Sequence, residues 1–395
     1  MTPVSFISRF RQALRSDLES PKAERQLGKG WVSGTVALIL AIASLFLVIG
    51  LLYPEWFTFK ETRPFYEKPV FHVVLLGVLL GAFVLAVISL VLRQNKILGF
   101  TALFLVILAT TLGGANAHSH VAQGSPVYLG MDWFVLNIIF TGILFVPLQL
   151  LFPRYPTQDF FRFEWREDLF YYFISTMLVQ VLTYAALWPA LTLTSHTHWE
   201  AFRAAISGQW LVFQVLEIMF LTDVVQYWVH RLFHRIPWLW NFHAVHHSAQ
   251  VMDWMSGARM HFMEILVLRA FTAVPMFILG YSQAALSFYI FFVYLQSTFV
   301  HANFGWNLST LGRYLVTPRF HHWHHGIEKE AIDVNFAIHF PLLDRIFGTY
   351  FLPKDKWPDG YGIGGHPVPK GYWKQFWYPF RKQSPAENAS EPPGT

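Results

Sequence analysis

Long apolar segments separated by short polar ones dominate the chain. Eight of them run for about 17 to 23 residues, the length with which a helix crosses a hydrocarbon core of about 30 Å. Their limits are residues 31–53, 70–92, 97–115, 133–152, 168–190, 208–229, 264–281 and 283–301. The pattern predicts an all-α fold, a polytopic membrane helical bundle of about eight spans.

The composition agrees with this assignment and narrows the chemistry. Hydrophobic residues make up 54% of the 395 positions and charged residues only 13%, whereas a soluble domain carries about 25% charged residues. Cysteine is absent, which excludes disulfides, thiolate metal sites and a cysteine nucleophile. Any bound metal must be held by nitrogen or oxygen atoms, and the net charge of +5 gives no indication of nucleic-acid binding.

The positions of Lys and Arg predict the orientation of the spans, because the cytoplasmic side normally collects these residues. With the N-terminus inside, 24 of the 29 Lys and Arg residues fall on the cytoplasmic side. The exceptions are Lys60, Arg63, Lys68 and Arg203 on the opposite side and Arg269 within a span. We therefore expect both termini in the cytoplasm. No cleavable signal peptide is expected, because about 30 mixed-charge residues precede the first span.

Three parts of the chain differ in content. Residues 1–130 contain three spans and no metal-like spacing, so we expect an accessory transmembrane bundle. Residues 131–353 hold the other spans and all histidine groups with metal-like spacing, and form the expected functional domain. Residues 354–395 form a cytoplasmic tail, whose end from Gln383 is rich in Pro, Ser and Glu and is expected to be disordered.

Three groups of closely spaced histidines, called here the histidine boxes, carry the chemistry. The first closes the sixth span as H-R-L-F-H, the second reads H-A-V-H-H and the third H-H-W-H-H. Their members are His230 and His234, then His243, His246 and His247, then His321, His324 and His325. Positions i, i+3 and i+4 share one face of a helix. We therefore expect each three-histidine box to aim its imidazoles at one point.

By the predicted topology all three boxes lie at the cytoplasmic boundary of the membrane, where they can meet in a histidine-rich helical cap. Two spans, one out and one back, separate the second box from the third. His301 ends the last span at the same level and is a candidate ninth ligand. Crowded imidazolium charges would repel one another, whereas neutral imidazoles readily converge on a cation. The boxes therefore predict a metal centre.

The number of imidazoles exceeds the capacity of one ion, since tetrahedral zinc accepts four ligands and octahedral iron six. Two ions are the simplest solution. Two closed zinc sites would have a purely structural role, and redox iron with open positions for oxygen is the catalytic alternative. A zinc hydrolase is disfavoured, because the sequence has no H-E-x-x-H motif.

Residues beside the boxes add to the expected site. Thr317 and Pro318 suit the start of a helix, so the third box should form a short helix. On that helix His322 points away from the metal, as a hydrogen-bond donor or a surface residue. Asp223 lies two turns before His230 at membrane depth. We expect this carboxylate to orient a ligand imidazole through its free N–H group.

The flanking residues carry a resemblance to a known family. The stretch from Asp223 to Ser248 reads D-V-V-Q-Y-W-V-H-R-L-F-H-R-I-P-W-L-W-N-F-H-A-V-H-H-S, and further matches lie at residues 301–303, 317–325 and 344–350. In order, spacing and flanking residues this pattern resembles the fatty acid hydroxylase/sterol desaturase superfamily over residues 160–353. The three spans before residue 130 lie outside the resemblance.

The resemblance implies a membrane-embedded non-haem enzyme with two iron ions. Such an enzyme uses O2 as co-substrate to remove hydrogen from an unactivated C–H bond of a membrane lipid. The product is an alcohol or an alkene. Substrates in the family include sterols, fatty acyl and sphingoid chains, ether lipids, carotenoids and fatty aldehydes, and the resemblance is compatible with hydroxylation and with desaturation.

The family's ligand pattern matches the eight box histidines, and His301 matches a position where the family often has a further ligand. His261 lies in the segment R-M-H-F-M-E, which resembles a family segment that usually reads H-P-x-E, with Phe262 in place of the proline. We expect His261 to support a ligand rather than to bind the metal. The other residues expected to bind the metal or to support its ligands are Glu264, Asn303, His322 and Asn335.

Electrons must come from another protein, because the sequence holds no flavin, nicotinamide or haem motif. Gly364-Gly365-His366-Pro367 resembles the haem segment of a cytochrome b5 only in reversed order. We expect a separate ferredoxin or cytochrome b5-like donor. The competing interpretation is a non-catalytic membrane metal protein, either a zinc scaffold or a metal carrier. A carrier should have ionisable residues spread along its spans, whereas the histidine boxes cluster at one end.

Overall fold

The computed structural model of the chain describes residues 6–118, 129–196, 198–306, 308, 310–365 and 367–381. Within these ranges the fold is all-helical, as predicted, and extended pairing is limited to one isolated bridge between Gly326 and Tyr361. The chain divides into two compact units, residues 1–138 and 139–395. The tail from Gln383, expected to be disordered, lies outside the described residues.

The first unit is a bundle of apolar helices. Small side chains line the contacts between its three long helices, as is usual between membrane helices: Ala41, Ala82 and Ala102 are fully buried. A buried ion pair joins Arg93 to Asp17 of the first helix. Its elements are α1 (Phe6–Leu18), η1 (Lys22–Glu24), α2 (Trp31–Leu52), α3 (Pro54–Phe57), α4 (Arg63–Tyr66), α5 (Pro69–Leu92), α6 (Ile97–Thr111), η2 (Gly114–Asn116) and the start of α7 (Met131–Leu151).

The second unit holds the rest of α7 and all three histidine boxes. Its further helices are α8 (Trp165–Met177), α9 (Val179–Thr194), α10 (Glu200–Ser207), α11 (Leu211–Arg235), α12 (Pro237–His247), α13 (Phe262–Leu279), α14 (Gln283–His301), α15 (Pro318–His324), α16 (Leu342–Ile346) and α17 (Tyr372–Trp377). Short 3-10 turns are η3 (Ser256–Ala258), η4 (Leu311–Arg313), η5 (Lys329–Ala331) and η6 (Tyr378–Phe380).

Seven helices of the described chain are long and apolar enough to cross a membrane. They match every expected span except the one over residues 168–190. There the chain forms α8 and α9, which are bent by 42° and together would make an eighth span. Within α8 the hydroxyl of Thr176 donates a hydrogen bond to the carbonyl of Tyr172, a contact that commonly bends helices.

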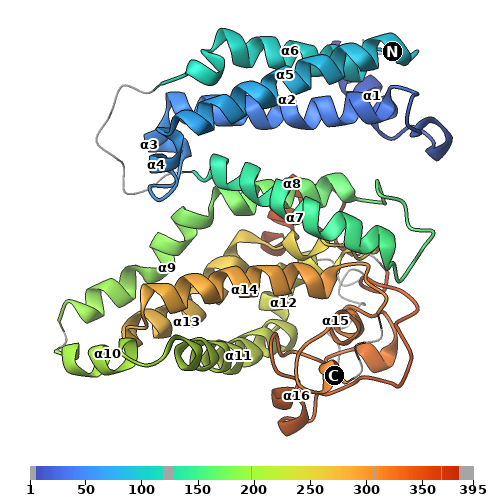
Figure 1. The fold of residues 1–395 in the computed structure, drawn as a ribbon. Coiled ribbons are helices and arrows are strands. Elements are labelled where there is room, and N and C mark those ends of the chain that lie inside the picture. Colours follow the sequence, from blue (N-terminus) through green and yellow to red (C-terminus); the bar gives the residue numbers. More distant parts are fainter. Residues whose placement is uncertain are drawn as a thin grey trace. The chain divides into compact units, whose positions relative to one another are not determined.

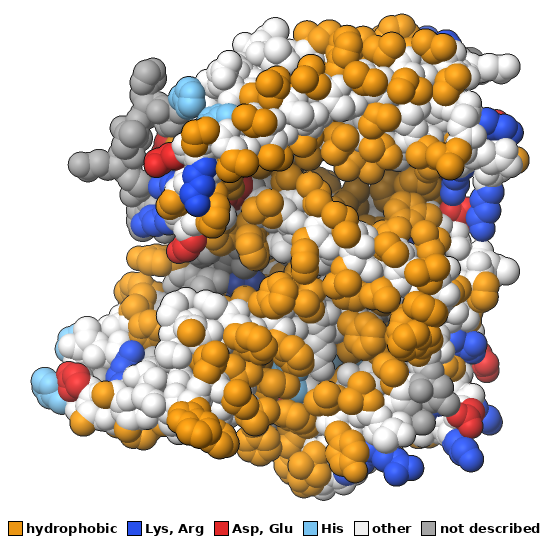
Figure 2. All heavy atoms as spheres, viewed as in Figure 1, with side chains coloured by type: hydrophobic (Ala, Val, Ile, Leu, Met, Phe, Trp, Pro, Cys, Tyr) orange, Lys and Arg blue, Asp and Glu red, His pale blue; other side chains and the backbone are white. Residues whose placement is uncertain are grey.

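The outer surfaces of these helices are apolar, as a lipid-facing surface requires. Val73 in α5, Ile143 in α7 and Phe220 in α11 are each more than half exposed. Figure 2 shows that hydrophobic side chains cover much of the visible surface of each unit, with few charged side chains among them. This distribution is that of a polytopic membrane protein.

The histidine boxes meet because two short helices follow the long ones. Only Ile236 separates α11 from α12, and Pro237 favours a new helix start there, so the second box turns back toward the first. α14 contacts α15. Figure 1 shows α12 and α15 close together, at the end of α14 that lies away from α10.

Candidate metal centre

Nine histidines converge in two groups of buried imidazoles. In each group one nitrogen per residue lies within 4.8 Å of the corresponding nitrogens of all the others. The first cluster consists of His230, His234, His243, His247 and His324. The second cluster consists of His246, His301, His321 and His325.

The two clusters share both three-histidine boxes, so the expectation that each box aims at one point is wrong. In α12, His243 and His247 join the first cluster and His246 joins the second. In the third box, His324 joins the first cluster and its neighbours three residues before and one after join the second. Residues i and i+4 are about 40° apart around a helix axis, but i+3 and i+4 are about 100° apart. The i+3 residue therefore faces the neighbouring cluster.

The Nε2 atoms of the first cluster face one another at short range. Nε2 of His243 lies 3.0 Å from Nε2 of His230 and 3.1 Å from Nε2 of His247. Nε2 of His247 lies 3.0 Å from Nε2 of His324. The fifth member, His234, has a buried Nε2 without a hydrogen-bond partner. Five ring nitrogens thus point into one small volume.

The second cluster has the same arrangement. Nε2 of His301 lies 3.4 Å from Nε2 of His246 and 3.0 Å from Nε2 of His321. Nε2 of His325 lies 3.2 Å from Nε2 of His321. Four ring nitrogens from α12, α14 and the third box therefore converge here.

Several of these rings are fixed through their other nitrogen, Nδ1. A backbone carbonyl can only accept a hydrogen bond, so Nδ1 opposite a carbonyl carries the proton and Nε2 keeps a free lone pair. Four rings are held in this way. The contacts run from His230 to Phe336 (3.0 Å), from His324 to Val334 (2.8 Å), from His246 to Arg259 (3.0 Å) and from His301 to Ser297 (2.7 Å).

Carboxylates hold two further rings of the first cluster. Oε1 of Glu264 in α13 lies 2.6 Å from Nδ1 of His243. Oδ1 of Asp333 lies 3.3 Å from Nδ1 of His234. Carboxylates in this position fix ring orientation and raise the basicity of the metal-binding nitrogen.

These contacts test whether metal ions fit the clusters. Nε2 atoms of His246 and His301 both carry lone pairs, because Nδ1 of each ring faces a backbone carbonyl, so this pair cannot be a hydrogen bond. Lone pairs that converge at 3.4 Å are stabilised by a cation, and the Nε2 atoms of the first cluster lie at a similar distance of 3.0 Å. Two nitrogens bound to one metal at about 2.1 Å lie roughly 3.0 to 3.4 Å apart. The nitrogen donors therefore fit one ion per cluster.

Asp223 has a different contact from the one expected. Its carboxylate accepts hydrogen bonds from the backbone N–H groups of Ile338, His339 and Phe340, at 2.7 to 3.1 Å, instead of orienting a ligand imidazole. Asp344 accepts the N–H groups of the preceding residues 336 and 337. Both carboxylates thus fix the loop of residues 333–340, whose carbonyls hold two rings of the first cluster.

The other residues singled out in the sequence lie around the clusters. His261 caps α13 by accepting the N–H of Met263 and reaches the carbonyl of Phe376. His322 is fully buried, so it is not a surface residue, and its Nε2 lies 3.3 Å from the carbonyl of His301. Burial lowers the pKa of His322 to about 3.

The two asparagines fix loops beside the boxes. The amide of Asn303 contacts the backbone N–H and carbonyl of Tyr155. Nδ2 of Asn335 donates to the carbonyls of Phe320 and Phe351, which ties α15 to the segment after α16. Both side chains act on the backbone.

Burial keeps the clusters neutral. Loss of solvation holds the pKa of the histidines in α12 well below the ordinary value of 6.5, and neighbouring imidazoles act in the same direction. The same holds for His321, His324 and His325. Neutral imidazole is the form that binds metal, so the electrostatics favour the proposed ligands over a wide pH range.

A cavity of about 120 Å³ lies against both clusters. His230 and His243 of the first cluster and His246, His301 and His321 of the second are part of its wall. The remaining wall is mostly apolar, with Gln226, Gly257, Met260, Glu264, Leu268, Val293, Gln296, Ser297, Val300, Val316 and Ile338. A hydrocarbon segment in this cavity would contact ligands of both clusters.

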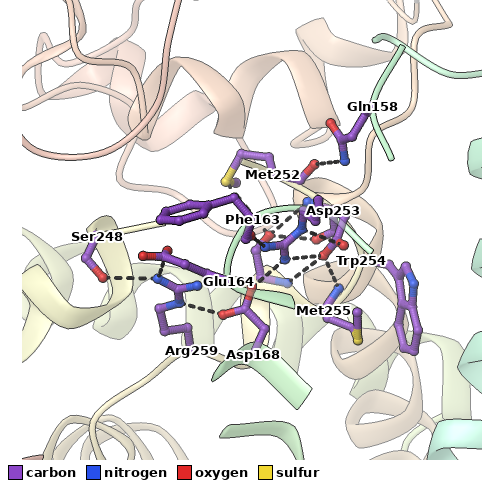
Figure 3. Close-up of polar contacts among 12 residues, drawn as sticks. Gln158, Phe163, Glu164, Asp168, Ser248, Met252, Asp253, Trp254, Met255 and Arg259 are labelled. Carbon is purple, nitrogen blue, oxygen red and sulfur yellow. Dashed lines mark hydrogen bonds and ion pairs between the residues drawn. The ribbon is translucent and has the colours of Figure 1, made fainter. Parts of the chain in front are cut away.

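A buried ionic network beside the second cluster was missed by the sequence analysis. Arg162 binds both oxygens of Asp253, at 2.7 Å each, and also contacts Asp168. Arg259 binds Asp168 at 2.5 Å and Glu164 at 2.7 Å. Figure 3 shows the acidic side chains converging on the two guanidinium groups. These five residues are called here the arginine network.

One sequence signal pointed to this network. Asp253 and Arg259 are the only acidic and basic residues between the second box and His261. In a chain with so few charged residues, an acidic and a basic residue in this mostly apolar segment would be expected to form ion pairs. Although burial alone lowers the pKa of Arg162, Asp253 and Asp168 raise it above its ordinary value.

Comparisons with known proteins bear on the same region. Residues 215–349 match the family model described as fatty acid hydroxylase. The chain is 28% identical to ornithine lipid hydroxylase of Rhizobium tropici, over 52% of this chain and 60% of that protein. It is 31% identical to alkylglycerol monooxygenase of Xenopus tropicalis, over 34% of this chain and 30% of that protein. It is 30% identical to methylsterol monooxygenase 2-2 of Arabidopsis thaliana, over 34% of this chain and 52% of that protein.

These matches cover only part of this chain and part of each relative. The chain spans less than two thirds of the length of each of these three relatives. No solved structure matches the chain at a significant level. The family model covers all nine histidines of the two clusters, whereas helices α1 to α10 lie outside it.

Proposed function

We propose that this chain, whose residues 215–349 match the fatty acid hydroxylase family model, is an O2-dependent di-iron oxidoreductase of the membrane. Its reaction is hydroxylation, or desaturation, of an unactivated C–H bond in a membrane lipid. Its relatives by name are a lipid hydroxylase and two monooxygenases, which supports an oxidoreductase acting on a lipid.

The observation that carries this proposal is the pair of converging lone-pair clusters. Five and four imidazole nitrogens converge in the two clusters, and six of these nine rings are held by a group bonded to the other ring nitrogen. The first cluster would hold one iron and the second cluster the other. Bound iron supplies O2 activation; hydroxylation then consumes one C–H bond, O2, two electrons and two protons, and yields an alcohol and water.

The chain's own residues position the lipid and protect the reaction. The apolar walls of the cavity, including Leu268, Val293 and Ile338, accept a hydrocarbon segment and exclude water. Gln226 and Ser297 are polar residues of the same wall. Each can form one hydrogen bond with a polar group of the lipid, as donor or as acceptor. The product, like the substrate, is a membrane lipid and remains in the membrane.

The sequence-based expectations for the surroundings are part of the proposal. Both termini and the clusters lie on the cytoplasmic side, and electrons arrive from a separate ferredoxin or cytochrome b5-like protein. Residues 1–130 act as an accessory bundle, residues 131–353 as the catalytic domain and residues 354–395 as a tail. The excess of Lys and Arg on one side supports this orientation.

The first experiment is a metal determination on detergent-purified protein from cells grown with iron-57. Close to two irons per chain, with the Mössbauer signature of a coupled pair, is the expected result. Two zinc ions that persist after growth in iron-rich, zinc-poor medium would instead establish a structural metal protein and overturn the proposal.

The second experiment identifies the lipid. Membranes with and without the protein are supplied with O2 and reductant, and ornithine lipids, alkylglycerols and methylsterols are compared by mass spectrometry. A gain of one oxygen, or a loss of two hydrogens, in one lipid class is expected. A variant with His324→Ala and His325→Ala, which removes a ligand from each cluster, is the matched negative control.

A further inference from the structure

The arginine network brackets one turn of the chain, residues 253–259, called here the network turn. Asp253 at its start binds Arg162, and Arg259 at its end binds Asp168 and Glu164. The side chains of both arginines and of Asp168 are at most 2% exposed. The network therefore clamps both ends of the turn to the chain segment that begins α8 (Figure 3).

The interior of the network turn is closely fixed as well. Oδ1 of Asp253 accepts the N–H groups of Met255 and Ser256, at 2.8 and 3.1 Å. The hydroxyl of Ser256 donates back to the carbonyl of Asp253 at 2.6 Å. The same carboxylate that binds Arg162 thus also shapes the turn.

The network turn contacts two of the four histidines in the second cluster. The carbonyl of Arg259 accepts the Nδ1 proton of His246 at 3.0 Å. Gly257 packs directly on the ring of His301, since a Cβ at this glycine would lie 2.7 Å from Nδ1 of that ring. The turn thus holds the ring of His246 by a hydrogen bond and packs against the ring of His301, whose Nδ1 also contacts the carbonyl of Ser297.

The first cluster depends on other supports. Its fixed Nδ1 atoms face the carbonyls of Val334 and Phe336 and the carboxylates of Glu264 and Asp333. These groups belong to α13 and to the loop of residues 333–340. The two clusters therefore have separate supporting structures, although they share helices.

We propose that the arginine network is a positioning device for the second cluster. By fixing the network turn it sets the orientation of His246 and His301, and so determines how tightly this cluster holds its metal, with little effect on the first cluster. The inference rests on the proposed function only in taking each cluster to bind one metal ion.

The test is metal binding by Asp168→Asn, which keeps the size of the side chain and removes the charge shared by both arginines. Purified, metal-stripped protein is titrated with Co2+ against a competing chelator. Wild type should bind two ions. The variant should bind one ion with unchanged affinity and the second at least tenfold more weakly, the usual effect of removing a group that orients a ligand.

Two reference variants assign the retained ion. His325→Ala removes a ligand from the second cluster, and His324→Ala removes one from the first. The Co2+ absorption spectrum of singly loaded Asp168→Asn should match that of His325→Ala and differ from that of His324→Ala. Asp17→Asn breaks a comparably buried ion pair with Arg93 in the first unit and should bind two ions normally.

The outcomes separate the inference from its premise. If wild type binds fewer than two ions, the proposed function fails and the inference with it. If wild type binds two and Asp168→Asn binds two with unchanged affinities, or loses both equally, the positioning role alone is refuted. Should Asp168→Asn not fold, Arg162→Lys keeps the charge and loses the two-pronged contact with Asp253, and the same selective loss is expected at smaller size.

Discussion

Gly257→Ala tests the packing of the second cluster with the addition of a single methyl group. The new Cβ would lie 2.7 Å from Nδ1 of His301, whereas ordinary contact begins at 3.4 Å. The ring or the turn must move by the difference, roughly 0.7 Å. The ring is held on both sides, because Nδ1 is 2.7 Å from the carbonyl of Ser297 and Nε2 is 3.0 Å from Nε2 of His321.

The expected cost follows from this confinement. Adding a methyl group to a closely packed interior costs about 1 to 3 kcal/mol. If the strain falls on the metal-bound arrangement, the affinity of the second cluster falls by about 5- to 150-fold. Chelator competition with Co2+ measures the loss directly, and the first cluster should keep its affinity.

Gly142→Ala is the matched control. Gly142 lies in α7, and a Cβ there meets no atom within 4 Å. This variant should bind both ions normally and, because alanine favours helix by about 1 kcal/mol over glycine, should be no less stable. Normal binding of both ions by Gly257→Ala would show that the contact with His301 does not determine the metal site.

Three further results are expected. Glu264→Gln removes a charge-assisted hydrogen bond to His243, worth about 1.5 to 3 kcal/mol. It should weaken the first metal site about 10- to 100-fold in the same titration, whereas the control Glu217→Gln, on α11, should leave the affinity of that site unchanged. His324→Ala should abolish lipid oxidation and lower metal content, whereas His322→Ala should lower the melting temperature and keep both ions; equal metal loss would place His322 among the ligands. In metal-stripped protein, the histidines of α12 and the third box have pKa values well below 6.5 when folded, so only the unfolded chain takes up their protons. Stability should be full above pH 6.5 and fall as the pH drops below it, by up to about 1.4 kcal/mol per pH unit for each such histidine; a melting temperature that is flat from pH 8 to 5 would contradict this.

Much of the architecture follows from the sequence because its cause is local. A helix that crosses a membrane must be long and apolar over its whole length, so the limits of the spans could be read directly, apart from the break between α8 and α9. The four-residue step from His230 to His234 likewise places both rings on one side of α11. Spacing within a helix also grouped the histidines, although their role as ligands stays a prediction.

The division of each three-histidine box between two clusters could not be read from spacing. It depends on how α12 and the third box are rotated relative to α11 and α14, which is decided by packing. The partner of Asp223 depends on a loop more than 110 residues away along the chain. Glu264 was among the expected residues, but its contact with His243 required the fold.

The charges show a related difficulty. Arg93, Arg162 and Arg259 were counted as evidence of orientation, but all three are buried in ion pairs within the protein. Removing them from the 24 Lys and Arg on the cytoplasmic side still leaves 21 against four on the other side. The count without the three buried arginines still favours the predicted orientation, but a count of charges alone does not separate buried ion pairs from the other charged residues.

The interleaving of the clusters has a consequence for the spacing of the two ions. α12 and the third box each send side chains to both clusters. A shift of either segment therefore moves rings of both clusters together, so that the distance between the two metal sites is set within these short segments themselves rather than by the packing of one helix against another.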